Sequence, residues 1–337
     1  MAYRMGIDTG GTFTDLVAVD PAGGGRLHVA KVPSTPAAPG RAVFDALAGS
    51  GIPVEELSLL VLGTTIGINA VLERRGARVL YLTTDGFQDV PFIQRIDKKD
   101  PYDLQWQKPV PFVARRDCIG VRERVAADGA VLTELTDGEL DRIAAAVAER
   151  LAEPAESPGR GVALAVNLLF SYVNPAHERR LAGFLSRRFP GVPVTVAGAI
   201  APMWREYERG NTAILDAYLR PRMSGWIREL EQGLGERRFA GALTIMKSNG
   251  GQVAAAAATE LPAHTMLSGL SGGVIGGRYF GEQAGRRDLI TFDMGGTSTD
   301  VALVVGGRVS YTTGYEVEFS LPVSAPSGDP RTVGAGA

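Results

Sequence analysis

The sequence is poor in the residues that disulfides and most zinc sites require. Its 337 residues include one cysteine and three histidines. With Cys118 alone, no disulfide can form within the chain, which favours a reducing compartment. The histidines are His28, His177 and His264, and their spacing predicts no zinc site. Because no histidine stands near it in the sequence, Cys118 is interpreted as a small apolar side chain rather than a nucleophile.

Neither sign of charge dominates, and no apolar run reaches the length of a membrane span. The formal net charge is −2, which provides no basic footprint for nucleic acid and no polybasic patch for a membrane surface. Apolar residues make up 45% and charged residues 21%, as in an ordinary globular protein. The first residues contain no apolar signal core. These features predict a cytoplasmic protein with neither nucleic-acid nor membrane partners.

Apolar runs and turn signals predict an α/β protein with mixed sheets. The residues up to Val32 are predicted to form antiparallel strands, after which strands and helices alternate. Thr136 and Glu139 form a capping box that begins a helix. Residues 84–124 are irregular, either a ligand-contacting insertion or a surface excursion packed by its own aromatic side chains. Helices from about residue 206 begin a second unit, which gives predicted domains at 1–200 and 201–337.

An eight-residue pattern of aspartate, glycine and threonine occurs twice. Residues 8–15 read DTGGTFTD and residues 293–300 read DMGGTSTD, with six of eight positions identical. Each copy follows one apolar strand and precedes another, so both are predicted to be turns of β-hairpins. The sequence has no P-loop, and the first copy lacks the Rossmann glycine spacing.

The residue types of the repeated pattern suit the phosphates of a nucleotide. Paired glycines let backbone N–H groups approach an anion, and threonine hydroxyls add neutral donors. An aspartate aimed at a phosphate would repel it, whereas one that holds the hydration shell of Mg²⁺ would not. The alternative is a pair of tight hairpins whose polar side chains cap backbone groups. Repetition in matching strand–turn–strand settings favours phosphate binding.

The two copies supply the candidate nucleotide and metal residues. We assign Asp8 and Asp293 to catalysis and to magnesium, which they would orient through water. The residues assigned to the phosphates are Gly10, Gly11, Thr12, Thr14, Gly295, Gly296, Thr297 and Thr299. A role in bracing the hairpins is the alternative for Thr14, Asp15, Thr299 and Asp300.

Several segments together make the sequence similar to a known family. They are residues 6–15, 63–76, 205–209, 246–251, 267–274 and 291–301. The two loops resemble the phosphate motifs of the actin-like ATPase superfamily, which clamps ATP between two ribonuclease-H-like domains. Within that superfamily, the ordered segments resemble the hydantoinase A/5-oxoprolinase family, which includes N-methylhydantoinase A. The resemblance implies one phosphate loop in each of two duplicated ATPase domains.

The resemblance also implies a reaction, with ATP and Mg²⁺ as cofactors. Family members open a cyclic amide, such as 5-oxoproline or a hydantoin, by hydrolysis that depends on ATP. Related members activate ketones for carboxylation. An amide carbonyl is a poor electrophile, and phosphorylation of its oxygen creates a leaving group. Two alternatives stay open, namely a phosphotransferase on the same fold and a nucleotide-binding subunit without catalytic activity.

The sequence departs from the family pattern in two places. Leu270 and Ser271 stand where the family usually has Pro-Ala. Residues 329–337 match only the beginning of a glycine-rich family motif, beyond which family members continue. The resemblance therefore implies an incomplete second domain. The expected partner is a hydantoinase B-like subunit or the missing C-terminal half.

Polar residues near strand ends are candidates for the substrate side of the site. They are Thr64, Thr65, Asn69, Ser248 and Asn249. A helix N-cap for the first three and an ordinary turn for the last two are equally good interpretations. Arg205, Glu206 and Arg209 are interpreted as carboxylate-binding or cleft-shaping residues, or as a solvated ion-pair face of a helix. The Gly/Ser run at 268–277 either approaches the nucleotide or allows close helix packing.

Overall fold

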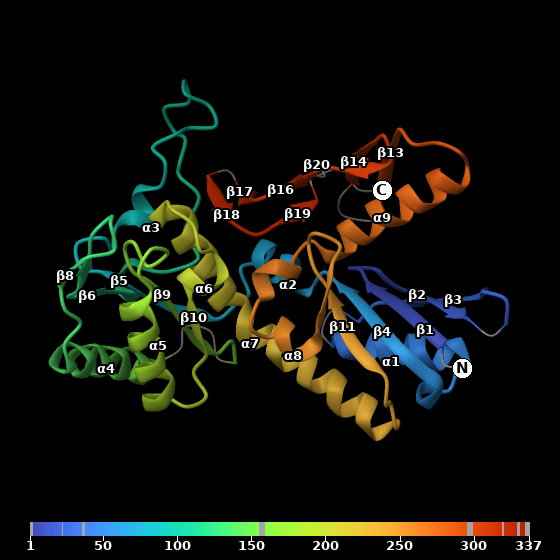
Figure 1. Ribbon diagram of the computed structural model, residues 1–337, viewed down its shortest axis with the longest axis horizontal. Coiled ribbons are helices and arrows are strands. Elements are labelled where there is room, and N and C mark those ends of the chain that lie inside the picture. The colour runs from blue at the N-terminus through green and yellow to red at the C-terminus, as the bar shows by residue number, and fades with distance from the viewer. Residues whose placement is uncertain are drawn as a thin grey trace. The chain divides into compact units, whose positions relative to one another are not determined.

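The computed structural model describes residues 3–21, 23–35, 38–154, 159–294, 299–318, 320–328 and 331–333. The chain folds into two compact units, each built from stretches that are separate in the sequence. The first unit comprises Met1–Asn69, Met223–Thr313 and Pro326–Ala337, and the second comprises Ala70–Arg222 and Gly314–Ala325. Figure 1 labels most of their helices and strands. The units interleave along the chain, whereas the division predicted near residue 200 is a single boundary, which stays a prediction.

A six-stranded sheet forms the frame of the first unit, in the order β12-β11-β4-β1-β2-β3. Its strands are β1 (Tyr3–Thr9), β2 (Phe13–Asp20), β3 (Arg26–Pro33), β4 (Leu57–Thr64), β11 (Ala242–Met246) and β12 (Gln252–Ala254). β1, β2 and β3 are antiparallel neighbours, as predicted, whereas β4 runs parallel to both β1 and β11. The sheet is therefore mixed, and the carboxyl ends of β1, β4 and β11 meet at one edge.

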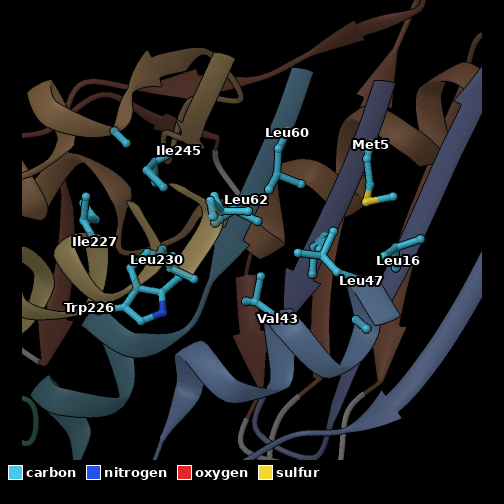
Figure 2. Packing of buried hydrophobic residues seen from close by; sticks show 14 of the residues in the cluster. Met5, Leu16, Val43, Leu47, Leu60, Leu62, Trp226, Ile227, Leu230 and Ile245 are labelled. Carbon is cyan, nitrogen blue, oxygen red and sulfur yellow. The ribbon is translucent and has the colours of Figure 1, made fainter. Parts of the chain in front are cut away.

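The core of this unit lies on one face of the six-stranded sheet. Every second side chain of β1 is buried, because successive side chains of a strand point to opposite faces. Helix α1 (Pro39–Ser50) and the second half of α7 (Glu206–Glu236) pack against that face. Figure 2 shows this packing, with labels on Met5, Leu16, Val43, Leu47, Leu60, Leu62, Trp226, Ile227, Leu230 and Ile245.

A second, smaller sheet of the first unit contains β13 (Leu289–Met294), β14 (Thr299–Val305), β15 (Arg308–Val309) and β20 (Arg331–Val333). Helix α9 (Ser268–Gln283) covers one face, around a small core that includes Val274 and Val304. Glycines bring this helix close to the sheet, since a Cβ on Gly277 would lie 2.4 Å from Cγ2 of Thr291. On the same sheet Ile290 and Phe292 are 65% and 63% exposed. This sheet thus rests on a smaller core than its larger neighbour.

The second unit is built on a four-stranded parallel sheet, in the order β10-β9-β5-β6. Its strands are β5 (Arg78–Thr84), β6 (Cys118–Val121), β9 (Val162–Asn167) and β10 (Val194–Val196). Helices α4 (Asp137–Ala152) and α5 (Ala176–Arg188) contribute to its core. One half of the capping box predicted at the start of α4 is confirmed, because the Thr136 hydroxyl accepts the Glu139 N–H at 3.2 Å; the Glu139 carboxylate instead accepts the Arg122 N–H at 2.8 Å and pairs with Arg142. The α/β class with mixed sheets is likewise confirmed.

Shorter elements complete the described chain. They are η1 (Val54–Glu56), α2 (Ile66–Leu72), α3 (Val90–Ile93), η2 (Arg115–Asp117), β7 (Arg124–Val125), β8 (Val131–Thr133), α6 (Ala197–Ile200), α8 (Ala255–Ala258), η3 (Pro262–Thr265), β16 (Tyr311–Thr312), β17 (Tyr315–Glu318), β18 (Leu321–Val323) and β19 (Ser327–Gly328). Between residues 85 and 123 only α3, η2 and β6 are regular, so most of that segment is irregular, as predicted. Within the described ranges, no helix has both the length and the apolar character to cross a membrane.

Burial of Cys118 agrees with its interpretation from the sequence. The side chain begins β6 and is 8% exposed. Burial in an apolar environment raises the pKa of the Cys118 thiol to about 12. The thiol is therefore protonated at neutral pH, and a protonated thiol is a poor nucleophile.

Candidate functional site

The candidate site lies in the first unit, at the edge where the parallel strands end. β1 and β4 pair with Asp8 opposite Gly63 and Thr9 opposite Thr64. On the other side of β4, Leu62 pairs with Ile245 of β11, so the residues after Met246 reach the same edge. Ligands of α/β sheets bind outside the carboxyl ends of parallel strands. The fold therefore brings the first aspartate and the predicted substrate residues to one side of the sheet.

The first Asp/Gly/Thr pattern forms the predicted hairpin turn between β1 and β2. The Gly10 N–H donates to the Phe13 carbonyl oxygen at 3.0 Å. A Cβ on Gly10 would lie 3.0 Å from that same oxygen, which explains the need for glycine there. Gly11 and Thr12 are exposed, and a Cβ on Gly11 would meet no atom within 4 Å. The backbone at Gly11 is therefore open to a ligand.

The hairpin register places the polar side chains of the pattern on two different faces. Asp8 is opposite Asp15, and Thr9 is opposite Thr14. Thr14 is fully buried, with its hydroxyl 3.0 Å from the Ser34 hydroxyl, and its contacts brace the hairpin. Asp15 is held by Lys31, whose Nζ donates to its Oδ1 at 2.9 Å. Asp15 shares a face with Asp8 but is paired with Lys31, whereas Asp8 lies between Asp15 and Gly63 of β4.

The carboxyl group of Asp8 sits close to glycine backbone. A Cβ on Gly63 would lie 2.6 Å from its Oδ1, and a Cβ on Gly269 would lie 3.1 Å from it. Although part of the side chain reaches solvent, the surrounding backbone removes water from the carboxyl group. This burial is the main cause that raises the pKa of Asp8, followed by the charges of Asp15 and Asp293.

Helix α9 connects the two aspartates of the repeated pattern. Gly269, next to Asp8, belongs to its first turn, and Gly273 stands four residues later. A Cβ on Gly273 would lie 3.8 Å from Oδ2 of Asp293. Residues four apart share one face of a helix, so Asp8 and Asp293 lie beside the same face of α9. Two carboxylates whose charges interact, beside the N-terminus of a helix, form a site suited to a cation and its bound anion.

The second pattern forms a hairpin with the same register as the first. Asp293 pairs with Asp300, and Met294 pairs with Thr299. Gly295, Gly296 and Thr297 lie outside the described residues, and so do the side chains of Thr299 and Asp300. In the described part of the chain, no group of three or more His, Cys, Asp or Glu side chains could hold a metal ion.

The first three predicted substrate residues form hydrogen bonds with nearby residues of α2 and β1. The Thr64 hydroxyl accepts the Ile66 N–H at 3.1 Å, and the Thr65 hydroxyl donates to the Thr9 carbonyl at 3.1 Å. Asn69 in turn donates to the Thr65 hydroxyl at 3.1 Å. These bonds fix the start of α2 against the end of β1. The bond that Thr64 accepts from Ile66 agrees with the capping alternative, whereas the bonds of Thr65 and Asn69 link α2 to β1 and do not cap the helix.

The other two predicted substrate residues form a turn after β11. Ser248 is fully buried, and its hydroxyl accepts the Leu267 N–H at 3.1 Å. The Asn249 side chain accepts the Gly251 N–H at 3.0 Å, which makes an Asx-type turn. Ser248 therefore fixes the chain just before α9.

Three residues outside the assigned set help to shape this edge. The buried Ser268 hydroxyl donates to the Thr64 carbonyl and accepts the Thr64 N–H, both at 3.1 Å, so it ties α9 to β4. Gly63 and Gly269 leave room for the Asp8 carboxyl group. All three belong to the family-like segments 63–76 and 267–274, but nothing in the sequence connects those segments to Asp8. Arg205, Glu206 and Arg209 lie in the second unit, where they line a separate cavity.

Comparison with known proteins gives two family matches along the chain. Residues 4–189 match the hydantoinase/oxoprolinase N-terminal region, and residues 209–337 match the hydantoinase/oxoprolinase family itself. The chain is 34% identical to 5-oxoprolinase 1 of Arabidopsis thaliana over 371 residues, which cover 99% of the chain and 28% of that protein.

Two solved structures share the fold over nearly the whole chain. A nucleotide-free acetone carboxylase, from work on ATP-dependent acetone carboxylation, superposes with a TM-score of 0.83 at 28% identity, covering 100% of this chain and 48% of that one. The ATP-dependent caprolactamase from Pseudomonas jessenii gives a TM-score of 0.81 at 29% identity, covering 99% and 48%. The chain thus spans less than half the length of each of these relatives. With family matches from residue 4 to residue 337, the chain belongs to the hydantoinase/oxoprolinase family.

Proposed function

We propose that the first unit binds Mg·ATP along the edge formed by Asp8, Gly10–Thr12, the start of α9 and Asp293. The proposed reaction is ATP-dependent hydrolysis that opens a cyclic amide of the 5-oxoproline or hydantoin type, through phosphorylation of its carbonyl oxygen. The observation that carries this proposal is the placement of both pattern aspartates beside Gly269 and Gly273 of α9.

The residues at this edge fit magnesium and phosphate. Burial and like charges raise the pKa of Asp8, and a divalent cation would relieve both effects. Mg²⁺ prefers oxygen ligands and keeps several of its waters when it binds. Because the phosphates of ATP supply further oxygen ligands, a protein site with few carboxylates is sufficient for it. Asp8 and Asp293 would hold it through water. The ion would neutralise charge on the transferring phosphoryl group.

The other residues of the edge position the phosphates and the substrate. Gly11 leaves open space beside its backbone, and Thr12 is exposed next to it. On residue types alone, Gly295, Gly296 and Thr297 are assigned to the phosphates as the matching positions of the second pattern, and Thr14 and Thr299 are assigned to supporting the two hairpins. We assign the cyclic amide to the side of the edge made by Thr64, Thr65, Asn69, Ser248 and Asn249. Their local bonds keep that side rigid, as positioning requires.

The relatives bear on the partners of the chain. Each compared relative is more than twice the length that the chain covers. We therefore propose that turnover involves further polypeptide, either a hydantoinase B-like subunit or a C-terminal half of the same kind as in the relatives.

Calorimetry of Mg·ATP binding tests the nucleotide site. The chain should bind Mg·ATP, and Asp8→Ala should weaken that binding by about tenfold or more, because a charge-assisted contact is worth roughly 1.5–3 kcal/mol. Asp45→Ala is the matched control, since Asp45 lies exposed on α1 and pairs with Arg41 at 3.6 Å. Equal affinity of Asp8→Ala and the unaltered chain would remove Asp8 from the site.

Product analysis tests the reaction in the assembled enzyme. Phosphate and ring-opened product should form in equal amounts, and only with a cyclic amide and ATP present. A phosphorylated product that survives would instead identify a phosphotransferase. Nucleotide binding without any turnover would identify a non-catalytic subunit.

A further inference from the structure

One face of the smaller sheet of the first unit carries large apolar side chains that are exposed. Ile290 and Phe292 of β13 and Leu303 and Val305 of β14 are between 56% and 65% exposed. Ile290 pairs with Leu303, and positions two apart on a strand share a face, so all four side chains lie on one face of the sheet. Helix α9 covers the other face, where Val304 is buried (Figure 1). The exposed side chains therefore form one apolar surface across two strands.

The repeated pattern shows how the matching face is covered in the first hairpin. Counted from the two aspartates, Ile290 and Phe292 correspond to Met5 and Ile7 of β1. Met5 and Ile7 are each 2% exposed, in the core that α1 and the second half of α7 complete. α1 packs against β1, β2 and β3 alike. The exposed face of the second hairpin thus has the residue types of a core face without the burial of one.

A groove lies beside the outer edge of β13. In the ranges that the structure describes, β13 pairs with β14 alone, whereas β1 lies between β2 and the parallel strand β4. The groove has a volume of about 570 Å³, and its lining includes residues 289–293 together with Val274 and Phe280 of α9. An edge strand leaves a row of backbone N–H and C=O groups unpaired. In the first hairpin β4 fills the corresponding place, where Ser268 of α9 bonds to Thr64.

A residue placed opposite Asp293 across this edge has little room. In the first hairpin Gly63 of β4 pairs with Asp8, and a Cβ on Gly63 would lie 2.6 Å from Oδ1 of Asp8. The two hairpins share one register, so a parallel strand added to β13 would bring one residue to the place of Gly63. Gly273 of α9 already lies beside the Asp293 carboxyl group. Glycine is therefore the residue expected opposite Asp293.

We propose that a helix–strand segment of the further polypeptide docks on this surface. Its strand lies in the groove, parallel to β13, with a glycine opposite Asp293. The helix before that strand is amphipathic, and its apolar side covers the exposed face. The order is that of α1 and β4 in the first hairpin, and a parallel strand requires a crossover of this kind. The inference rests on the proposed function in taking the further polypeptide as the occupant.

Thiol labelling of the full chain tests the docking. The probe is a fusion of the chain to the part of the Pseudomonas jessenii caprolactamase that it does not cover, since the two share a fold with a TM-score of 0.81. Ile290→Cys should react with a maleimide in the unfused chain and at least tenfold more slowly in the fusion. Cys118 is buried, so the new thiol is the reactive one. Asp45→Cys, exposed on α1, should react equally in both. Equal labelling of Ile290→Cys in both would overturn the proposal.

Amide exchange distinguishes an added strand from cover by a helix alone. Peptides that contain residues 289–294 should exchange more slowly in the fusion, because an added strand pairs the outward N–H groups of β13. Unchanged exchange would overturn the strand even if Ile290→Cys were protected. A photo-crosslinker on Ile290→Cys should attach to a helix–strand segment, which mass spectrometry identifies. A bulky residue opposite Asp293 in that segment would contradict the assigned register.

A charge on the apolar face tests which molecule covers it. Phe292→Asp should leave the melting temperature of the unfused chain unchanged, because this position is 63% exposed. In the fusion it should restore the labelling of Ile290→Cys, because docking would bury the charge. Light scattering that found an unfused dimer, made monomeric by Phe292→Asp, would identify a second copy as the occupant and overturn the proposal. Asp8→Asn in the fusion should lower ATP turnover and leave Ile290→Cys protected, so failure of the nucleotide site and failure of docking are distinguishable.

Discussion

The two hairpins carry the same eight-residue pattern in different surroundings. Both pair their first and last aspartates, Asp8 with Asp15 and Asp293 with Asp300. β1, however, lies inside a six-stranded sheet between β4 and β2, whereas β13 is the edge strand of the smaller sheet. The pattern therefore determines the register of a hairpin, and the neighbouring strands determine how firmly that hairpin is held.

Equivalent positions show how large the difference in support is. Ile7 precedes the first aspartate and is 2% exposed, whereas Phe292 precedes the second and is 63% exposed. The first hairpin contributes to the main core through β1 and β2 (Figure 2). The core beneath the second contains Val274, Ala302 and Val304 as its buried members. A ligand bound by both hairpins would therefore be held more rigidly by the first hairpin than by the second.

The largest effect on turnover is expected if the two hairpins act as one catalytic unit. Asp8→Asn and Asp293→Asn should each lower ATP-dependent ring opening by on the order of 10²–10³-fold, the usual cost of losing one preorganised electrostatic contact. Because both aspartates would serve the same ion, the double variant should be barely worse than either single one. A double-mutant cycle on turnover of the assembled enzyme measures this.

The affinity of the cyclic amide serves as the internal control for that cycle, since neither aspartate is assigned to it. It should change little in all three variants. Fully additive losses in turnover would mean that the hairpins act independently, and the shared site beside α9 would have to be abandoned.

A stability comparison at equivalent positions should show the next largest effect. Ile7→Ala should lower the free energy of unfolding by about 2–5 kcal/mol, because it opens a cavity in a packed core. Phe292→Ala should change it by no more than about 0.5 kcal/mol, as expected of an exposed site. Denaturant unfolding of both variants measures the two values. Similar losses in the two would contradict the difference in support described above.

The hairpins could be predicted from the sequence because the residues that specify them lie next to one another in the chain. The glycine pairs and flanking apolar strands were sufficient to predict that each pattern joins two antiparallel strands, and the Thr136 cap follows from a four-residue pattern. The alternation in β1 and β2 also separates Asp8 from Thr14, although the pattern alone placed Asp8 at the magnesium and Thr14 at the phosphates of one ligand. Thr14 faces the core and bonds Ser34, a contact with a residue twenty positions away.

The long-range contacts of the site could not be predicted from the sequence, because they join residues that lie far apart along the chain. Gly63 and Gly269 stand about two hundred positions apart, and only the pairing of β1 with β4 and the packing of α9 bring both to Asp8. The positive φ of Arg205 was equally hidden, because arginine has no intrinsic preference for that conformation. A single sequence does not specify which distant backbones come together.

The glycines beside the aspartates give a smaller and sharper test. Gly63→Ala places a methyl group 2.6 Å from Oδ1 of Asp8, so the carboxyl group must move. We expect a loss of about 1–3 kcal/mol in unfolding free energy, as for overpacking elsewhere, and weaker Mg·ATP binding. Gly6→Ala, on β1 with Asp8, meets no atom within 4 Å and should be neutral.

Along α9, the same substitution distinguishes the two hairpins. Gly269→Ala approaches Asp8 to 3.1 Å, whereas Gly273→Ala stays at an ordinary 3.8 Å from Asp293. Calorimetry should therefore find nucleotide binding weaker in Gly269→Ala than in Gly273→Ala. The reverse order would show that the second aspartate, not the first, depends on close contact with the helix.

The smallest expected effect is a pH dependence that belongs to the first hairpin. Burial, together with Asp15 and Asp293, raises the pKa of Asp8 above its ordinary value of 3.8, so the folded chain binds this proton more tightly than the unfolded chain does. Stability from this group is present at low pH and is lost as the pH rises through the raised pKa. Without magnesium, Asp8→Asn should melt at a higher temperature than the unaltered chain at pH 7, and the gap should close as the pH falls toward 4. Asp45→Asn, on the exposed face of α1, should show no such gain.

Mg·ATP should reverse the order of the melting temperatures at pH 7, because ligand binding stabilises the chain that retains the site. A lower melting temperature for Asp8→Asn in magnesium-free buffer at pH 7 would mean that the Asp8 carboxylate stabilises its surroundings, and the argument for a cation at this edge would lose its electrostatic basis.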